Sequence, residues 1–507
     1  MGVGLSFASN TIFNFVIGLL IARFLGPAEF GRFALASATA VVINTAAFDW
    51  IRLAAVRFYS ERTRRDDPHV RATLNACLGA MTLATTIVIA AMVFSGHDLA
   101  LSPVLLAMAA ATGFASGVFD YHAALARSRF LNHTYARIII TKNVLSLVLT
   151  AGGSFLLHSA AVALAGVSVS AVASILPALR ALKDPGAGPS AARPTMAFGF
   201  WLYGAPLIGA SILYQMIPLA NRYLVARVYG FGETGQFSLA NDIGIRVLAA
   251  IASTLDVLLF QLAVRAEESH GPAHARAQVA DNMSIVIAVV LPAAAGIWAV
   301  TPSFEALIVP EAFRDPFAAY LTLMLPGLAS FVLLQFAVSP IFQIAKRTAP
   351  LIWASTIACV SDAILIGLAS SGSNALGLAL AQSGALFIGL VCAIIFAALT
   401  EPVWPSRRDL FGAAFATLAM AFVLWPLREW RPGLTTLVIQ VALGGMVYVG
   451  IAIALNLARV RERLAALRRD GFHATPGGSM QLLADAAEGR AAPVDEATLT
   501  PSAGRRK

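Results

Sequence analysis

Apolar runs of about twenty residues recur along the whole chain, and a helix of that length crosses a hydrocarbon core about 30 Å thick. Fourteen such segments can be marked, at residues 4–24, 30–58, 72–95, 99–125, 137–157, 160–181, 197–228, 234–264, 281–301, 316–345, 349–370, 374–399, 410–427 and 433–458. The runs are continuous and do not alternate with a period of two, which excludes a membrane barrel. We therefore predict an all-α polytopic membrane protein with about 14 transmembrane helices.

Charge is scarce and unevenly placed. Only 12% of the 507 residues are charged, against about 25% in a soluble protein. The net charge of +9 comes from Arg and Lys residues in short loops and not from a basic patch interleaved with aromatics, so we expect no nucleic-acid partner. The three cysteines (Cys77, Cys359 and Cys392) are far apart in sequence, which argues against a disulfide framework or a metal cluster.

The loop cations predict an orientation. Fifteen Arg and Lys residues fall in the loops on one side, and four on the other, or six when Arg23 and Arg227 are included. Cytoplasmic loops carry the excess of positive charge. We expect both termini in the cytoplasm, although the first helix taken alone, which is followed by Arg23 and Arg32, argues the opposite way.

A short charged segment occurs twice. ARFLGPAEFGRFALA (22–36) and ARVYGFGETGQFSLA (226–240) are 204 positions apart and share eight of fifteen residues. The repeat predicts two six-helix lobes. The predicted division is an N-lobe at 1–181, a linker at 182–196, a C-lobe at 197–400, two extra helices at 401–458, and a basic, largely disordered tail at 459–507 that opens with ARVRERLAALRRD.

Each copy of the repeat predicts a hairpin between two helices. Gly26 and Gly230 suit the helix end that requires a positive φ, and Gly31 and Gly235 permit close helix approach. Glu29 and Glu233 fall in the first turn of the following helix, and Arg23 and Arg227 in the last turn of the preceding one, where each charge complements the helix dipole. The alternative is a direct substrate or gating role for these Arg and Glu residues.

The stretch SNTIFNFVIGLLIARFLGPAEFGRFALA (9–36) resembles the N-terminus of bacterial polysaccharide flippases, with the pattern R-x-L-G-P-x-x-[FY]-G. That family belongs to the superfamily of multidrug extruders and lipid II flippases. The resemblance covers the fourteen-helix layout and the repeat, although Phe231 replaces Pro27 in the second copy. It implies a central cavity that opens alternately to each side and is lined by helices 1, 2, 7 and 8.

Polar side chains lie on one face of each of those four helices. They are Asn10 and Asn14 in helix 1, Asp49 and Arg52 in helix 2, Gln215 and Arg222 in helix 7, and Asp242, Arg246 and Asp256 in helix 8. A charge at the bilayer centre costs about 2.5–3.5 kcal/mol. The five charged residues in helices 2 and 8 would together cost on the order of 15 kcal/mol in lipid, so they are expected to face water, substrate or one another.

Two interpretations of these charges remain open. Helical spacing predicts ion pairs of Asp49 with Arg52 and of Asp242 with Arg246. Alternatively, Arg52, Arg222 and Arg246 bind a pyrophosphate. The repeat offset also makes Arg52 and Asp256 equivalent positions that could pair across the cavity. Asp120, His122 and Lys142 near helix ends are expected to snorkel. Asp362 is a candidate proton or ion site without an obvious partner, and Pro206, Pro218, Pro292 and Pro326 mark bend points.

The resemblance implies a flippase of the bacterial inner membrane that carries a polyprenyl-pyrophosphate-linked oligosaccharide from the inner to the outer leaflet, as a monomer and without a cofactor. Its implied partners are membrane lipids, a polysaccharide polymerase and glycosyltransferases. The alternatives are a lipid II flippase, a multidrug antiporter, or a membrane sugar polymerase or ligase. An antiporter would need an acidic, aromatic-lined cavity, and an enzyme would need a large extramembrane loop, so neither is favoured. The coupling ion stays open.

Overall fold

The computed structural model describes residues 2–94, 100–184, 186–345, 347–369, 374–400 and 403–462, with side chains except those of residues 2–12, 207, 254, 256–258, 260–270 and 272. Gly2–Ala458 form one compact unit, and Arg459 begins a second. The tail beyond Glu462, including most of the segment ARVRERLAALRRD, lies outside the described residues.

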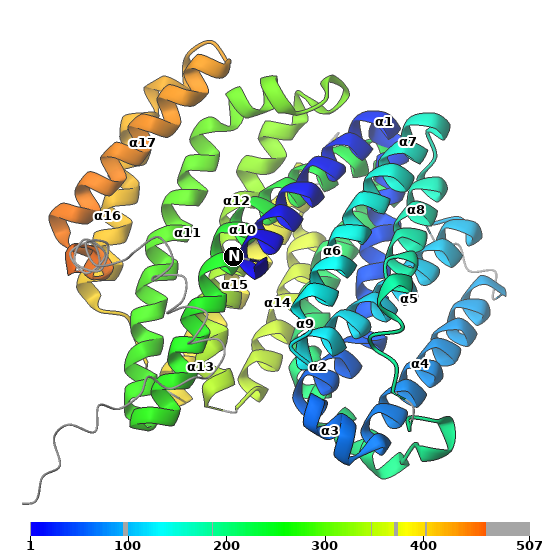
Figure 1. The fold of residues 1–507 in the computed structure, drawn as a ribbon. Helices are drawn as coiled ribbons and strands as arrows, with labels where there is room; N and C mark the ends of the chain where they lie inside the picture. The colour runs from blue at the N-terminus through cyan, green and yellow to red at the C-terminus, as the bar shows by residue number, and fades with distance from the viewer. Residues whose placement is uncertain are drawn as a thin grey trace, which may run out of the picture. The chain divides into compact units, whose positions relative to one another are not determined.

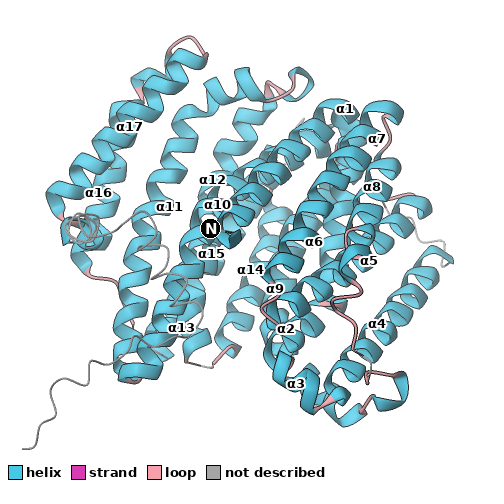
Figure 2. Ribbon diagram, in the orientation of Figure 1, coloured by secondary structure: helices cyan, strands magenta, loops and turns pink. Residues whose placement is uncertain are grey.

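Helices make up nearly all of the described chain, and no strand occurs in it (Figure 2). In chain order the helices are α1 (Gly2–Ala47), α2 (Asp49–Phe58), α3 (Glu61–Asp66), α4 (Pro68–Phe94), α5 (Pro103–Ser128), α6 (Asn132–Ser146), α7 (Gly152–Leu157), α8 (Ala160–Ala173), α9 (Pro194–Val228), α10 (Gly230–His270), α11 (Pro272–Ile308), α12 (Pro316–Leu333), α13 (Ser339–Ile344), α14 (Ala349–Leu368), α15 (Leu376–Thr400), α16 (Arg407–Leu424) and α17 (Leu434–Leu455). Short 3-10 turns occupy Leu176–Ala178, Pro189–Ala191, Glu311–Phe313, Pro426–Glu429 and Leu457–Arg459, and π-helical turns occupy Leu147–Ala151 and Leu334–Val338.

Each of the fourteen apolar segments is helical over most of its described residues, with α1 carrying the first and most of the second. By length and composition, 11 of the described helices could cross a membrane, or 12 if the bent α9 counts as one span. The predicted all-α polytopic fold is confirmed. α9 bends by 51° between Pro206 and Ile208, where proline removes a backbone donor from the helix.

The two copies of the repeat form turns at the same positions. Gly26 interrupts α1 with φ 71° and ψ 173°, and Gly230 has a φ of 86°, so both glycines adopt the conformation that costs other residues most. In Figure 1 the turn within α1 lies at one end of the N-terminal helices, and α3 lies at their other end.

The two turns also pack against each other. A Cβ atom on Gly31 would lie 2.0 Å from the main-chain oxygen of Phe231, and one on Gly235 would lie 2.0 Å from that of Pro27. The Arg32 guanidinium lies 5.0 Å from the centre of the Phe231 ring. The glycines therefore allow backbone-to-backbone contact between α1 and α10, as the small residues of the repeat predict.

Both glutamates of the repeat bind the start of a distant helix. Glu29 accepts a 2.9 Å hydrogen bond from the main-chain N–H of Ala160, where α8 begins. Glu233 accepts one of 3.3 Å from Ala375, just before α15, and another from the Tyr320 hydroxyl. These carboxylates satisfy donors that a helix start leaves unpaired. The side chains of Arg23 and Arg227 are exposed at the ends of their own helices.

Candidate functional site

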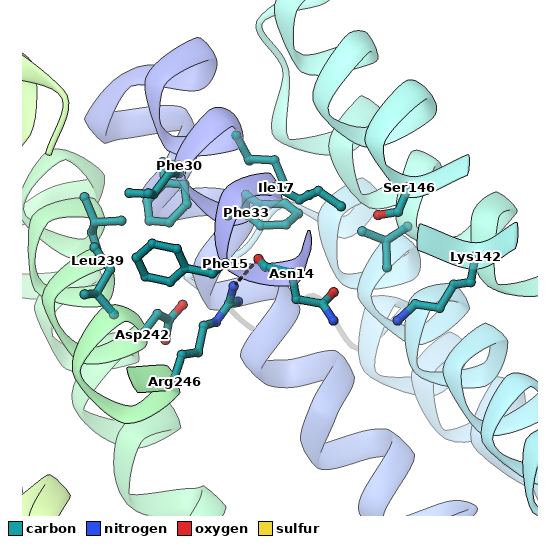
Figure 3. Close-up of a pocket in the computed structure, with 15 residues that line it drawn as sticks. Asn14, Phe15, Ile17, Phe30, Phe33, Lys142, Ser146, Leu239, Asp242 and Arg246 are labelled. Atoms are coloured by element: carbon teal, nitrogen blue, oxygen red, sulfur yellow. Dashed lines mark hydrogen bonds between the residues drawn. The ribbon is translucent and has the colours of Figure 1, made fainter. Parts of the chain in front are cut away.

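A cavity of about 150 Å³ lies beside the first half of α1 (Figure 3). Its polar lining residues are Asn14, Lys142, Ser146, Asp242 and Arg246, and its other lining residues are Phe15, Ile17, Gly18, Leu19, Ile21, Phe30, Phe33, Val167, Leu239 and Ile243. These residues come from both sides of the α1 turn and from α10, as the family resemblance implied, but also from α6 and α8. None of them belongs to α9, the helix that was expected to contribute Gln215 and Arg222.

Arg246, on α10, extends to the main chain of α1. Its Nη1 donates a 2.9 Å hydrogen bond to the backbone oxygen of Asn14. Gly18, one helical turn further along α1, makes this possible, because a Cβ atom there would lie 2.7 Å from Nη1. Asn14, a predicted cavity residue, and Gly18 therefore form the surface of α1 against which the Arg246 guanidinium lies.

The predicted ion pair of Asp242 with Arg246 is wrong. The Asp242 carboxylate instead accepts from Nη2 of Arg222 on α9, and from Nδ2 of Asn241 at 3.2 Å. Only 7% of the Arg222 side chain is exposed, and its Nη1 also donates to the Ala34 oxygen at 3.4 Å. Among the described residues, no carboxylate lies within ion-pair distance of Arg246.

Lys142 is a second cation of the cavity. It comes from α6 and lies on the opposite side of Asn14 from Arg246 (Figure 3). Its Nζ atom lies 5.1 Å from the centre of the Phe119 ring, and no described carboxylate is within ion-pair distance of it. The Lys142 side chain thus lines the cavity, and its snorkelling toward the membrane surface stays a prediction. The polar faces of helices 1, 2, 7 and 8 do not reveal this place in the cavity, because Lys142 belongs to α6.

The predicted pair in helix 2 is present. Nε of Arg52 donates to Oδ1 of Asp49 at 2.8 Å, with the i, i+3 spacing that predicted it. The hypothesis that Arg52 pairs with Asp256 stays a prediction, because the Asp256 side chain lies outside the described side chains, as does that of Asn10. Gln215 donates from Nε2 to Oγ1 of Thr45 at 2.9 Å, which joins α9 to α1.

Asp362 has a partner that the sequence did not reveal. This residue of α14 is 3% exposed, and both of its carboxylate oxygens accept from Nδ2 of Asn221 on α9, at 3.0 and 2.9 Å. The next residue of α9, Arg222, donates to the carboxylate of Asp242 in the cavity. α9 therefore supplies donors to two separate acidic groups. Asn221 and Asp362 are 141 positions apart, so only the packing of α9 against α14 reveals that they are partners.

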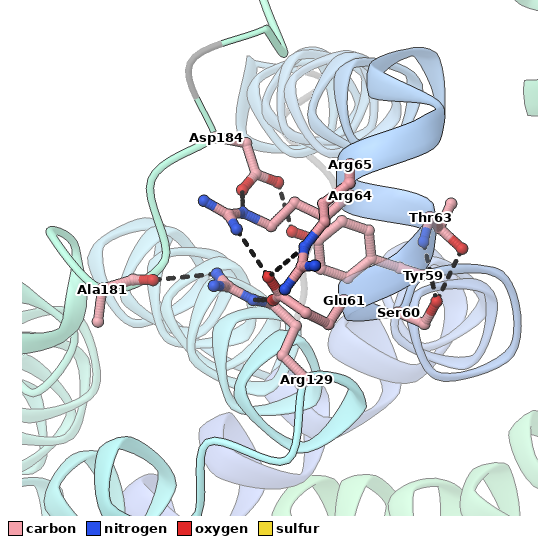
Figure 4. Close-up of polar contacts among 9 residues, drawn as sticks. All are labelled: Tyr59, Ser60, Glu61, Thr63, Arg64, Arg65, Arg129, Ala181 and Asp184. Atoms are coloured by element: carbon pink, nitrogen blue, oxygen red, sulfur yellow. Dashed lines mark hydrogen bonds and ion pairs between the residues drawn. The ribbon is translucent and has the colours of Figure 1, made fainter.

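A further polar cluster surrounds α3 (Figure 4). Glu61 accepts from Nε of Arg129 at 2.7 Å and from Nη1 of Arg64 at 2.8 Å, and Arg64 Nε donates to Asp184 at 2.5 Å. The hydrogen bond from Arg129 lowers the pKa of Glu61, and the hydrogen bond to Asp184 raises the pKa of Arg64. Burial, and then the bond to Asp184, raises the pKa of Tyr59. The cluster joins α3, the end of α5 and the chain after α8.

Metal binding receives no support from the described residues, since no group of three or more His, Cys, Asp or Glu side chains could hold an ion there.

Comparison with known proteins places the fold. The profile of a family described as "Polysaccharide biosynthesis protein" matches residues 3–259. The structure is similar to that of a lipid II flippase, MurJ, in an inward closed conformation, with a TM-score of 0.67 at 14% identity, over 89% of this chain and 98% of that one. It is also similar to a MATE transporter of Vibrio cholerae, with a TM-score of 0.49 at 9% identity, over 79% of this chain and 95% of that one. No curated protein sequence matches significantly.

Proposed function

The chain belongs to the polysaccharide biosynthesis protein family, and on that premise we propose that it is a flippase for a polyprenyl-pyrophosphate-linked oligosaccharide. In this proposal the sugar and the pyrophosphate cross the membrane through the interior, and the polyprenyl tail stays in the lipid. The direction is from the inner to the outer leaflet of a bacterial inner membrane, with both termini cytoplasmic. No step of covalent chemistry is required.

The observation that carries the proposal is the pair of cations, Arg246 and Lys142, that line the cavity. Lys142 is half-buried and Arg246 is exposed, and neither lies within ion-pair distance of a described carboxylate. Cations inside a membrane protein mark pathways for substrates. The neighbouring carboxylate, Asp242, is already taken by Arg222. A ligand that fits two cations without a carboxylate at ion-pair distance is an anion, and a pyrophosphate presents several oxygens to the guanidinium and the ammonium groups.

The size of the cavity supports a mechanism with more than one conformation. Sites for drug-sized ligands are about 300–1,000 Å³, whereas this cavity is about 150 Å³. An oligosaccharide therefore requires a wider state. We propose that the interior opens alternately to each side, with the bend at Pro206 as one place where α9 changes shape.

Asp362 is our candidate for coupling this movement to a proton or a cation. It is a buried carboxylate inside an apolar helix, and its partner Asn221 is neutral. A neutral partner leaves the negative charge uncompensated, which is the condition under which a carboxylate takes up a cation or a proton. The proposed protein partners are a polysaccharide polymerase and glycosyltransferases, and we propose that the chain acts as a monomer.

The test is deletion of the gene followed by analysis of lipid-linked intermediates. We expect a polyprenyl-linked oligosaccharide to accumulate on the inner leaflet, and the wild-type gene to clear it. Accumulation of lipid II would identify a lipid II flippase instead. Intact surface polysaccharide together with lost drug resistance would refute the proposal in favour of an antiporter.

A further inference from the structure

A second group of polar side chains lies on the N-terminal half, at the junction of α1, α5 and α9. Asn44 donates from Nδ2 to the Asp120 carboxylate at 3.1 Å. One residue later, Thr45 accepts from Nε2 of Gln215 at 2.9 Å. We call Asn44, Asp120 and Gln215 the acceptor group, for the reason given next.

Each amide of this group donates one hydrogen bond inside the protein, and its oxygen accepts none. Oδ1 of Asn44 and Oε1 of Gln215 are both buried, and neither has a hydrogen-bond partner among the described residues. The carboxylate of Asp120 adds further lone pairs and interacts electrostatically with Lys142 and Arg52. A side-chain amide oxygen accepts two hydrogen bonds and a carboxylate about four. The acceptor atoms of the group therefore outnumber the hydrogen bonds that they receive.

Such a group in an interior calls for a ligand with hydroxyl donors. Buried polar groups are paired in nearly all native structures, and an unpaired acceptor is unfavourable until a donor reaches it. Asn44, Asp120 and Gln215 are each only half-buried as residues, so a change in the surrounding helices can expose their oxygens. A sugar ring supplies several hydroxyl donors, whereas a polyprenyl pyrophosphate at neutral pH supplies almost none.

The acceptor group lies next to the cavity and not within it. Asn14 precedes the Gly26 turn by 12 residues and Asn44 follows it by 18, so at about 1.5 Å per residue Asn44 lies about 9 Å further from the turn. Lys142 connects the two regions, because it lines the cavity and interacts electrostatically with Asp120. A pyrophosphate beside Lys142 and Arg246 would thus bring its first sugars toward the acceptor group.

We propose that Asn44, Asp120 and Gln215 form a carbohydrate subsite that recognises hydroxyl groups of the sugar next to the pyrophosphate. This inference rests on the proposed function and adds to it a division of labour. The two cations bind the part common to all polyprenyl-linked substrates, and the acceptor group distinguishes a glycosylated lipid from a bare one.

The experiment compares two ligands on the purified full-length protein in lipid nanodiscs. One is the lipid-linked saccharide extracted from the deletion strain, and the other is polyprenyl pyrophosphate without sugar. For Asn44→Leu and Gln215→Leu we expect affinity for the glycosylated lipid to fall about tenfold or more, with affinity for the bare lipid unchanged. Arg246→Gln should weaken both.

Two further variants separate recognition from folding. Gln440→Leu is the matched control, since Gln440 is also a buried amide with a donated Nε2 and an unpartnered Oε1, but on α17, and it should change neither affinity. Gln215→Glu keeps the acceptor oxygens, and it should retain the preference for the glycosylated lipid.

The outcomes are distinct. Equal weakening of both ligands, or of neither, in the Leu variants would overturn the inference while leaving the flippase proposal intact. Sodium-dependent binding that ignores the sugar would assign these oxygens to a cation and also overturn it. If the deletion strain accumulates no lipid-linked saccharide, or the wild type binds neither lipid, the proposed function fails and the inference fails with it.

Discussion

Gly31 and Gly235 lie in direct contact across the two halves of the chain. A Cβ atom on Gly31 would approach the main-chain nitrogen of Gly235 to 2.9 Å, in addition to its clash with the Phe231 oxygen. Each glycine occupies the same position in its copy of the repeat. The contact therefore joins α1 and α10 at equivalent points, without side chains between them.

The first prediction concerns this contact. Gly31→Ala or Gly235→Ala places a methyl group 2.0 Å from a backbone oxygen, and backbone cannot yield as a flexible side chain does. We expect a loss of about 3 kcal/mol from the packed state, measured as a lower midpoint of thermal unfolding in detergent. Gly232→Ala is the control, because no atom lies within 4 Å of its added Cβ. Equal stability of all three variants would contradict the packing argument.

The second prediction concerns Gly18. Alanine there would meet only the tip of the Arg246 side chain, which can move, so stability should change little. The Arg246 guanidinium would lose its hydrogen bond to the Asn14 oxygen. Because one charge-assisted hydrogen bond is lost, we expect flipping to slow by about tenfold. Gly296→Ala in α11, where the added Cβ meets nothing, should flip at the wild-type rate. The measurement is reconstituted flipping of the lipid-linked saccharide.

The third prediction tests the two cations that line the cavity. Lys142→Gln and Arg246→Gln should each reduce flipping about tenfold or more, and the double variant should be inactive in the same assay. Arg23→Gln removes an exposed cation from a helix end and should leave the rate unchanged. An active double variant would remove the observation on which the anion site rests.

The fourth prediction concerns Arg222 and Asp242. Replacing Arg222 by Leu removes the ion-pair partner of the Asp242 carboxylate. We expect a loss of about 3 kcal/mol of stability, which is the low end for a broken buried pair. The low end applies because the Asp242 side chain is 25% exposed. Adding Asp242→Asn removes the charge and should restore most of the loss. A double-mutant cycle on the unfolding midpoint measures the coupling, and simple additivity would refute it.

The fifth prediction is a pH dependence of the cluster around α3. The bond from Arg129 lowers the pKa of Glu61, so ionised Glu61 stabilises the cluster above its ordinary pKa, about 4.3, and that contribution is lost as the pH falls through the lower folded value. Amide exchange of α3, corrected for intrinsic rates, should rise below about pH 4. Glu61→Gln should raise it already at neutral pH, while exchange in α16 stays unaffected.

Sequence reasoning succeeded where the controlling interaction is local. Continuous apolar runs specify helices, and the i, i+3 spacing of Asp49 and Arg52 specifies their ion pair, because both depend on neighbours along one helix. Sequence reasoning failed where a residue has possible partners on two helices and the packing of those helices selects one of them. Asp242 has a local partner one turn away, yet it pairs with Arg222 on α9, which buries the guanidinium more completely. Lys142 and the Asn221–Asp362 contact depend likewise on which faces meet in the folded chain.

The two repeat glutamates have a consequence for the order in which the chain is made. Glu29 binds the main chain of Ala160, 131 residues downstream, and Glu233 binds that of Ala375, 142 residues downstream. During synthesis each carboxylate stays without its partner until the sixth apolar segment of its own half leaves the ribosome. The first half can thus make its own glutamate contact before most of the second is translated, whereas the contact of Gly31 with Gly235 waits for the second half. In each half the glutamate contact forms only when α8 or α15 arrives.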